Sequence, residues 1–237
     1  AFYRAYADRW YLDRANKDNY LYRSSASKIG LSGGLVVPDL ETLDGVDLSV
    51  HAADIDAHMV DMFQTQRVGQ YLMPVPIHNT VDSALTADTI YAAPFWVVRN
   101  MTIDRLAIRV TTGAAGKIAR LGVYLDDGAC YLGALTVDAG TISVADAGVI
   151  AATISTALTR ALYWLVVVSD GAPTIRMIYS TWSPMGYSTG DIHASTIQQA
   201  WYKAAVGSGA LANPFVSGAT LQTNIAPGIT PRLLSLD

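Results

Sequence analysis

Apolar runs alternate with turn signals at short intervals between residues 88 and 180. The runs are rich in Val, Ile, Leu and Tyr, and Gly, Asp or Pro residues separate them, which is typical of strands joined by turns. In 149–158 apolar residues recur at every second position, whereas 161–168 is apolar on both faces and is expected in the middle of a sheet. Because no helical crossover separates the runs, the pattern predicts an all-β sandwich or barrel. The predicted strands are 89–98, 102–111, 117–125, 135–137, 141–144, 149–158, 161–168 and 174–179.

The two flanks of this region lack a regular period. Residues 1–87 are predicted to form an irregular or partly helical arm and linker, with a short helix at 51–64. In the C-terminal extension a short helix is predicted at 195–206, since Ser195 can cap it and Gly207 can end it. The extension is expected to pack on the sandwich or on a neighbouring subunit. The predicted division is 1–87, 88–180 and 181–237.

Aromatic residues and arginines are concentrated near the N-terminus. Such residues are enriched at buried protein interfaces, and a terminal arm cannot easily bury them by itself. We interpret the arm as a segment that docks on another protein; the alternative is a helix packed on its own domain. The candidate docking residues are Phe2, Tyr3, Arg4, Tyr6, Trp10, Tyr11, Tyr20 and Tyr22.

The overall composition narrows the function classes. Of the 237 residues, 51% are hydrophobic and 15% are charged, which excludes a wholly disordered, highly charged chain. A net charge of -4 argues against a broad electrostatic nucleic-acid binder. The single cysteine, Cys130, excludes an intrachain disulfide and a cysteine-rich zinc site. No secretory signal is recognised, and no apolar run reaches the ~18 residues of a membrane span, so a protein made in a cytoplasm is expected.

The residues with catalytic or metal-binding potential do not form a convincing constellation. His51, Asp54, Asp56 and His58 could ligate a metal, but they lie in a stretch, 39–61, with seven acidic and no basic residues, which favours a solvated acidic face. The acids of the β region fall mostly in predicted turns, where turn chemistry explains them. No paired carboxylates stand out for glycoside cleavage. We therefore expect a non-enzymatic protein without metal or cofactor.

Aromatic side chains near predicted loops are candidate contacts. Tyr131, Tyr179, Trp182 and Tyr187 could stack on a sugar ring or fill a partner's pocket. The alternative is that they cover the end of the sandwich or contact another subunit. Trp96 and Trp164 lie inside predicted strands and are expected in the core.

Several short motifs lie within residues 90–177. They are Arg120-Leu121-Gly122-Val123-Tyr124-Leu125-Asp126-Asp127-Gly128, Gly133-Ala134-Leu135, Asp138-Ala139-Gly140-Thr141 and Leu162-Tyr163-Trp164-Leu165. In these motifs the chain resembles a jelly-roll-like module of bacteriophage virion proteins, notably tail-fibre and other tail-associated proteins. Leu132 and Arg160-Ala161 depart from the usual Pro and Pro-Gly of that module. The resemblance implies a jelly-roll-like antiparallel sandwich.

The resemblance also implies a role. It points to a structural protein of a phage virion, on the tail rather than the head, made in the host cytoplasm. The expected function is a tail fibre or receptor-binding component that mediates host attachment as a homotrimer. Its partners would be other virion proteins, bound through the arm, and a host surface glycan or protein, without nucleic acid and without membrane insertion. The alternatives are a head-decoration or tail-assembly protein, and a carbohydrate-binding module of a polysaccharide-degrading enzyme.

Overall fold

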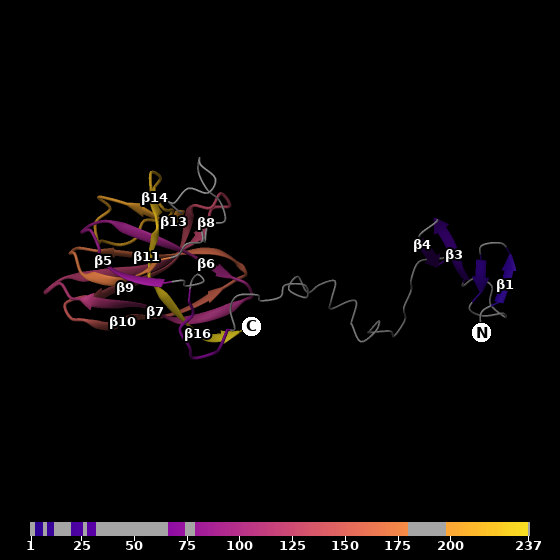
Figure 1. Cartoon of the computed structure of the whole chain (residues 1–237), viewed down its shortest axis with the longest axis horizontal. Coiled ribbons are helices and arrows are strands. Elements are labelled where there is room, and N and C mark those ends of the chain that lie inside the picture. The colour runs from indigo at the N-terminus through magenta and orange to yellow at the C-terminus, as the bar shows by residue number, and fades with distance from the viewer. Residues whose placement is uncertain are drawn as a thin grey trace. The chain divides into compact units, whose positions relative to one another are not determined.

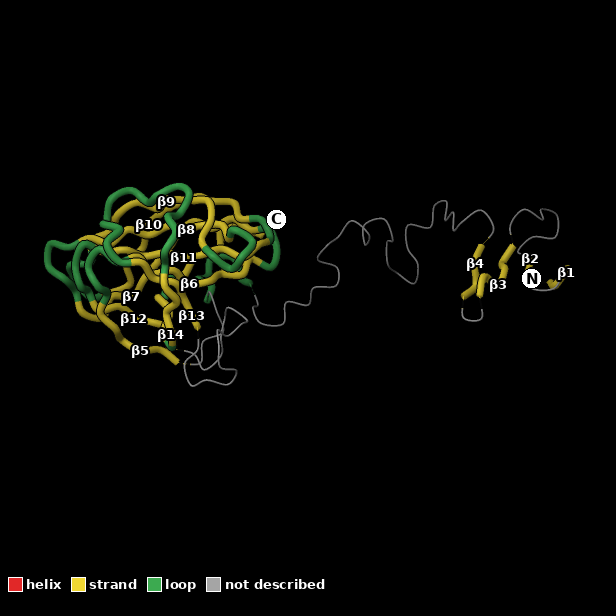
Figure 2. Tube along the Cα trace, turned by 90° about the horizontal axis from the view of Figure 1, so that it is seen from above, coloured by secondary structure: helices red, strands yellow, loops and turns green. Residues whose placement is uncertain are grey.

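The computed structural model divides the chain into two compact units, residues 1–60 and residues 61–237 (Figure 1). The residues that it describes are 3–6, 9–11, 20–25, 28–31, 66–73, 79–179 and 198–236, with side chains from residue 66 onward. No helix occurs in these ranges (Figure 2). Accordingly, none of their elements is a helix long and apolar enough to cross a membrane.

The first unit contains a small antiparallel sheet. Its strands are β1 (Tyr3–Tyr6), β2 (Arg9–Tyr11), β3 (Tyr20–Ser25) and β4 (Lys28–Leu31), paired in that order. The expectation of an irregular or helical arm is therefore wrong for these residues. Tyr, Trp, Leu and Ile favour a pleated sheet, and each strand pairs with its neighbour in the chain. The helix predicted at 51–64 lies outside the described residues.

The second unit is a sandwich of two six-stranded antiparallel sheets. Sheet I has the order β14-β13-β6-β11-β8-β9, and its strands are β6 (Ile90–Val97), β8 (Ile118–Asp126), β9 (Leu132–Ser143), β11 (Ala161–Ser169), β13 (Gln198–Lys203) and β14 (Thr220–Thr223). Sheet II has the path β10-β7-β12-β15, with β16 beside β7 and β5 beside β12. Its strands are β5 (Asn79–Ala84), β7 (Met101–Thr112), β10 (Gly148–Leu158), β12 (Thr174–Tyr179), β15 (Ile225–Pro227) and β16 (Thr230–Leu236). The predicted mainly-β sandwich is confirmed.

The main core lies between the two sheets. Phe95, Leu121 and Leu165 of sheet I and Ile103 and Leu106 of sheet II are completely buried there. Complete burial of such a side chain contributes roughly 1.5–3 kcal/mol. Strand β11 pairs with β6 on one side and β8 on the other, and every residue of this strand after Ala161 is buried. Its predicted central position is confirmed.

The sheets extend beyond the predicted limits of 88 and 180. Strand β5 pairs with β12 along its whole length, and Tyr71 forms a bridge with Arg232. At the other end β13 to β16 supply strands to both sheets of the same chain. The predicted limits are corrected accordingly, because hydrogen-bond pairing between distant segments leaves no mark on local sequence.

The helix predicted at 195–206 is wrong where the structure describes it, since residues 198–203 form strand β13. This strand pairs with β6 and with β14. Trp201 and Tyr202 alternate between the two faces, Tyr202 stacking on Tyr91 with ring centroids 6.3 Å apart. Sheet pairing and burial on both faces outweigh a weak helix propensity.

Strand β9 passes through a segment predicted as two strands and a turn. Gly140 has a φ of +77°, and the pairing with β8 shifts register beside Gly122. The Asp138 carboxylate accepts a hydrogen bond from the Gly140 amide at 2.9 Å. The turn signal therefore produces an irregularity inside one strand.

Candidate binding surfaces

The segment 204–219, which links β13 to β14, crosses the outer face of sheet I, and we call it the strap. Tyr124, Trp164 and Val166 form an apolar cluster on this face. Leu211 and Phe215 of the strap pack against that cluster, and the rings of Tyr124 and Phe215 meet edge to face with centroids 5.4 Å apart. Trp164 is completely buried as a result, as predicted, although it faces away from the main core.

Polar contacts fasten the strap to sheet I along its length. The hydrogen bonds run from Arg120 Nε to the Ser208 carbonyl (3.2 Å), from the Leu211 amide to Asp138 Oδ2 (3.1 Å), from Tyr124 Oη to the Ala212 carbonyl (2.8 Å), from the Leu135 amide to Asn213 Oδ1 (3.1 Å) and from the Phe215 amide to the Gly133 carbonyl (3.0 Å). The strap is thus a fixed third layer over the sheet.

Asp138 is the electrostatic centre of this attachment. Arg120 Nη1 lies 2.9 Å from both of its carboxylate oxygens. Burial by itself raises the pKa of Asp138, but hydrogen bonds from Gly140, Leu211 and Arg120 outweigh burial and hold that pKa below its usual value. Burial, followed by the charge of Asp138, raises the pKa of Tyr124 to about 12, so the Tyr124 hydroxyl keeps its proton for Ala212 at neutral pH.

A hollow of about 260 Å³ remains between the strap and sheet I. Ile90, Tyr124, Leu211 and Phe215 contribute to its lining, which is of mixed polar and apolar character. Lys203 also lines it, but its Nζ donates to the Ser217 carbonyl at 2.9 Å. The hollow is smaller than the ~300–1,000 Å³ typical of small-molecule sites. We regard it as a packing gap under the strap.

Of the loop aromatics singled out from sequence, Tyr131 serves packing. Its ring meets Trp201 and Phe215 edge to face, with centroids 4.9 and 5.9 Å away, and its hydroxyl accepts a hydrogen bond from the Ala219 amide at 2.8 Å. Tyr179, at the end of β12, is 40% exposed and available for contact. Trp182 and Tyr187 lie outside the described residues.

Trp96 is displayed on the surface, and its predicted core position is wrong. It is 51% exposed, whereas its neighbours Phe95 and Val97 are buried between the sheets. Alternation along β6 directs Trp96 to the outer face, and it is not part of the apolar cluster that packs against the strap there. The sequence carries a signal for this position, because Trp96 follows Phe95 directly in the strand and adjacent side chains lie on opposite faces.

The candidate docking residues at the N-terminus share one small sheet. The register places Tyr3 opposite Tyr11 and Tyr11 opposite Tyr20, so three tyrosines occupy one row across β1, β2 and β3. Trp10 lies between Arg4 and Leu21 in an adjacent row. Tyr6 and Tyr22 also belong to these strands, and Phe2 lies outside the described residues.

Carboxylates near the strap have structural partners. Asp126 accepts hydrogen bonds from Trp164 Nε1 at 2.9 Å and from the Gly128 amide at 2.8 Å, and Asp127 accepts one from Ala129. Burial, then Asp126 and Asp127, raise the pKa of the Cys130 thiol, which disfavours its reactive thiolate form. Within the described ranges no group of three His, Cys, Asp or Glu side chains could hold a metal ion. His51, Asp54, Asp56 and His58 lie outside those ranges.

The fold therefore defines a β-sandwich protein with a strapped outer sheet face. Comparison with known proteins gives no match, either to a protein-family model or to a curated protein sequence.

Proposed function

We propose that the chain is a non-enzymatic structural protein of a bacteriophage virion, most consistent with a tail-fibre or receptor-binding component. In this proposal the N-terminal unit anchors the protein on other virion proteins. The sandwich is the displayed part, and recognition of a host surface molecule uses its exposed side chains. Repeated copies, for which we propose a homotrimer, would raise weak single-site affinity through avidity.

The observation that carries this proposal is the division into two compact units of different character. Residues 61–237 contain both complete sheets and their own cover over sheet I. A sandwich built in this way does not need the first unit to close its core. The first unit carries the row of Tyr3, Tyr11 and Tyr20, a composition suited to a protein interface.

The partners of several carboxylates in the sandwich also support a non-enzymatic role. Asp126, Asp138 and Asp170 each accept a hydrogen bond from a backbone amide. Asp82 and Asp104 are paired with arginines. These hydrogen bonds and ion pairs give the carboxylates a structural role that does not depend on a substrate.

The test is to locate the protein on particles. Antibody raised against residues 61–237 is used for immunoelectron microscopy and for blots of purified, denatured particles from the source culture. Label on tails supports host attachment, and label on heads would replace it with the head-decoration alternative. A blot that finds no chain in any particle would overturn the virion assignment.

A further inference from the structure

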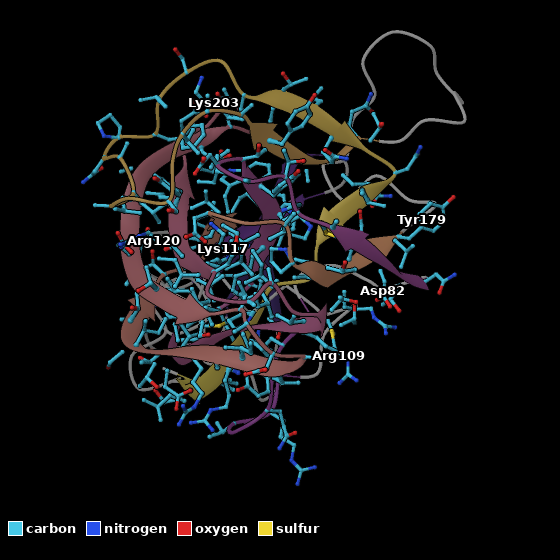
Figure 3. The ribbon with its side chains drawn as sticks, turned by 90° about the vertical axis from the view of Figure 1, so that its left-hand side faces the viewer. Asp82, Arg109, Lys117, Arg120, Tyr179 and Lys203 are labelled. Atoms are coloured by element: carbon cyan, nitrogen blue, oxygen red, sulfur yellow. The ribbon has the colours of Figure 1, made fainter. Side chains whose placement is uncertain are left out.

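The two sheets of the sandwich differ in charge. The strands of sheet II carry Arg105, Arg109, Arg176 and Arg232 against Asp82 and Asp104, a net charge of +2. The strands of sheet I carry Arg120 and Lys203 against Asp126 and Asp138, which cancel. Arg109 and Arg120 lie on different sides of the molecule (Figure 3). A chain of net charge -4 thus places an excess of arginine on one sheet.

The outer face of sheet II is built around strand β7, which pairs with β10, β12 and β16. Leu106, Ile108 and Val110 face the core, so the odd-numbered residues from Arg105 to Arg109 face outward. The register gives the neighbours of each: Arg105 lies between Thr153 and Arg232, Ala107 lies between Ala151 and Thr230, and Arg109 lies beside Val149. The small side chains of Ala107 and Ala151 therefore lie between the two arginines, and Ala107 is itself buried, with 1% of its surface exposed.

Two of the four arginines of sheet II are neutralised. Arg232 forms a two-point ion pair with Asp104, and hydrogen bonding to Arg232, set against burial, lowers the pKa of Asp104. Arg176 Nε lies 2.8 Å from Asp82 Oδ1.

Arg105 and Arg109 have no ion pair with any residue in the described part of the chain. Arg105 donates only to the neutral hydroxyl of Thr153, at 3.1 Å, and Arg109 is exposed. Arg105 lies directly opposite Arg232, and Asp104, which pairs with Arg232, also interacts with the charge of Arg105. Asp104 therefore offsets part of the like charge of these two arginines.

We propose that this face binds an acidic polysaccharide, whose uronate carboxylates pair with Arg105 and Arg109. Four residues of a strand separate the Cα atoms of Arg105 and Arg109 by roughly 13 Å, a spacing suited to a ligand that carries repeated anionic groups. Guanidinium matches carboxylate geometry in two-point hydrogen bonds. The hydroxyl of Thr153 accepts a hydrogen bond from Arg105 on this face, and the hydroxyl of Thr230 donates one to the Ala107 carbonyl. This inference names a ligand for the display role proposed above and rests on it.

The composition of the face distinguishes a polysaccharide from a nucleic acid. Strands β7, β10 and β16 contain no aromatic residue, and Tyr71, which forms a bridge with Arg232 at the edge of the sheet, is the exposed ring beside them, so they offer no series of rings on which successive bases could stack. Two uncompensated arginines are also few beside the roughly 6–10 phosphate contacts that make nucleic-acid binding strong.

The experiment measures binding of fluorescein-labelled polygalacturonate to the purified full-length chain, with labelled neutral dextran as the matched probe. We expect binding of polygalacturonate only, weakening as salt screens the exposed charges. Arg105→Gln together with Arg109→Gln should weaken binding about tenfold or more. The matched control, Arg99→Gln together with Lys117→Gln, removes the same charge from two turns and should leave binding unchanged. Circular dichroism confirms that both variants are folded.

Each result decides the proposal. No binding of polygalacturonate, equal binding of dextran, or equal losses in the two variants would overturn it. Labelled single-stranded DNA that binds more tightly than polygalacturonate and depends on the same arginines would assign the face to a nucleic acid instead. Because this assay uses purified protein, its failure is distinct from absence of the chain from virions, which would overturn the proposed function alone.

Discussion

Gly122 of β8 lies directly beneath Leu211 of the strap. A methyl group added at Gly122 would stand 2.3 Å from Leu211 Cδ1 and 2.9 Å from the Val137 carbonyl oxygen. The absence of a side chain at this strand position therefore lets the strap reach the sheet.

Gly122→Ala should destabilise the second unit by about 1–3 kcal/mol, because the strap or the neighbouring strand must move. Urea unfolding, monitored by fluorescence, measures the loss of unfolding free energy. Gly209→Ala is the matched control within the strap, since a methyl group there meets nothing within 4 Å. In a Leu211→Ala background the cost of Gly122→Ala should fall, because the two residues are in contact. Equal stability of Gly122→Ala and the wild type would contradict this view of the strap.

Truncation should destabilise the protein much more at Trp164 than at Trp96, the two strand tryptophans. Trp164→Ala should cost about 3–5 kcal/mol, since it empties a buried site and leaves Asp126 without its indole partner. Trp96→Ala should cost less than about 1 kcal/mol, because the indole is already half exposed. Thermal unfolding of both variants is the measurement, and a large loss from Trp96→Ala would show that its outer face is covered.

Acid should weaken the strap through Asp138. Its folded-state pKa is below its unfolded value of about 3.9, so its contribution to stability is complete above that value and is lost as pH falls through the folded-state pKa. Stability of the wild type should therefore drop below about pH 4. Asp138→Asn should reduce this dependence of stability on pH. Part of the dependence should remain, because the pKa of Asp104 is also lowered. Identical profiles for Asp138→Asn and the wild type would exclude this role.

Fragments should distinguish the observed unit from the predicted domain. Residues 61–237 contain both sheets and should fold alone, whereas residues 88–180 lack β5 and β13 to β16 and should not. Circular dichroism and cooperative thermal unfolding test both fragments. A cooperative fold for 88–180 would mean that the C-terminal strands are dispensable.

Much of the fold could be predicted from local pattern. Alternation in 149–158 and the continuous apolar run of 161–168 identified a strand with one buried face and a central strand, because both signals are carried within a few residues. The sequence Asp138-Ala139-Gly140 was correctly recognised as turn-like, because the Asp138 carboxylate accepts a hydrogen bond from the Gly140 amide. It produces an irregularity inside one strand and does not end that strand.

The remaining features depend on contacts between distant segments. Nothing near Trp201 indicates that it will pair with β6, so a capped helix was a reasonable local prediction. Trp96 and Trp164 both lie on the outer face of sheet I, and only the position of the strap buries one and leaves the other exposed. Arg105 and Arg232 are far apart in the chain, and their opposition exists only in the register of β7 and β16.

The most direct test of the central claim is incorporation into particles. The proposed function implies a phage whose genome encodes this chain, and that genome is made to encode either the full-length chain or residues 61–237, each with the same tag, after which purified particles are blotted for the tag. The account predicts that the full-length chain is incorporated and that the folded fragment, which lacks the anchoring unit, is not. Equal incorporation of the fragment, or absence of the full-length chain from particles, would contradict it.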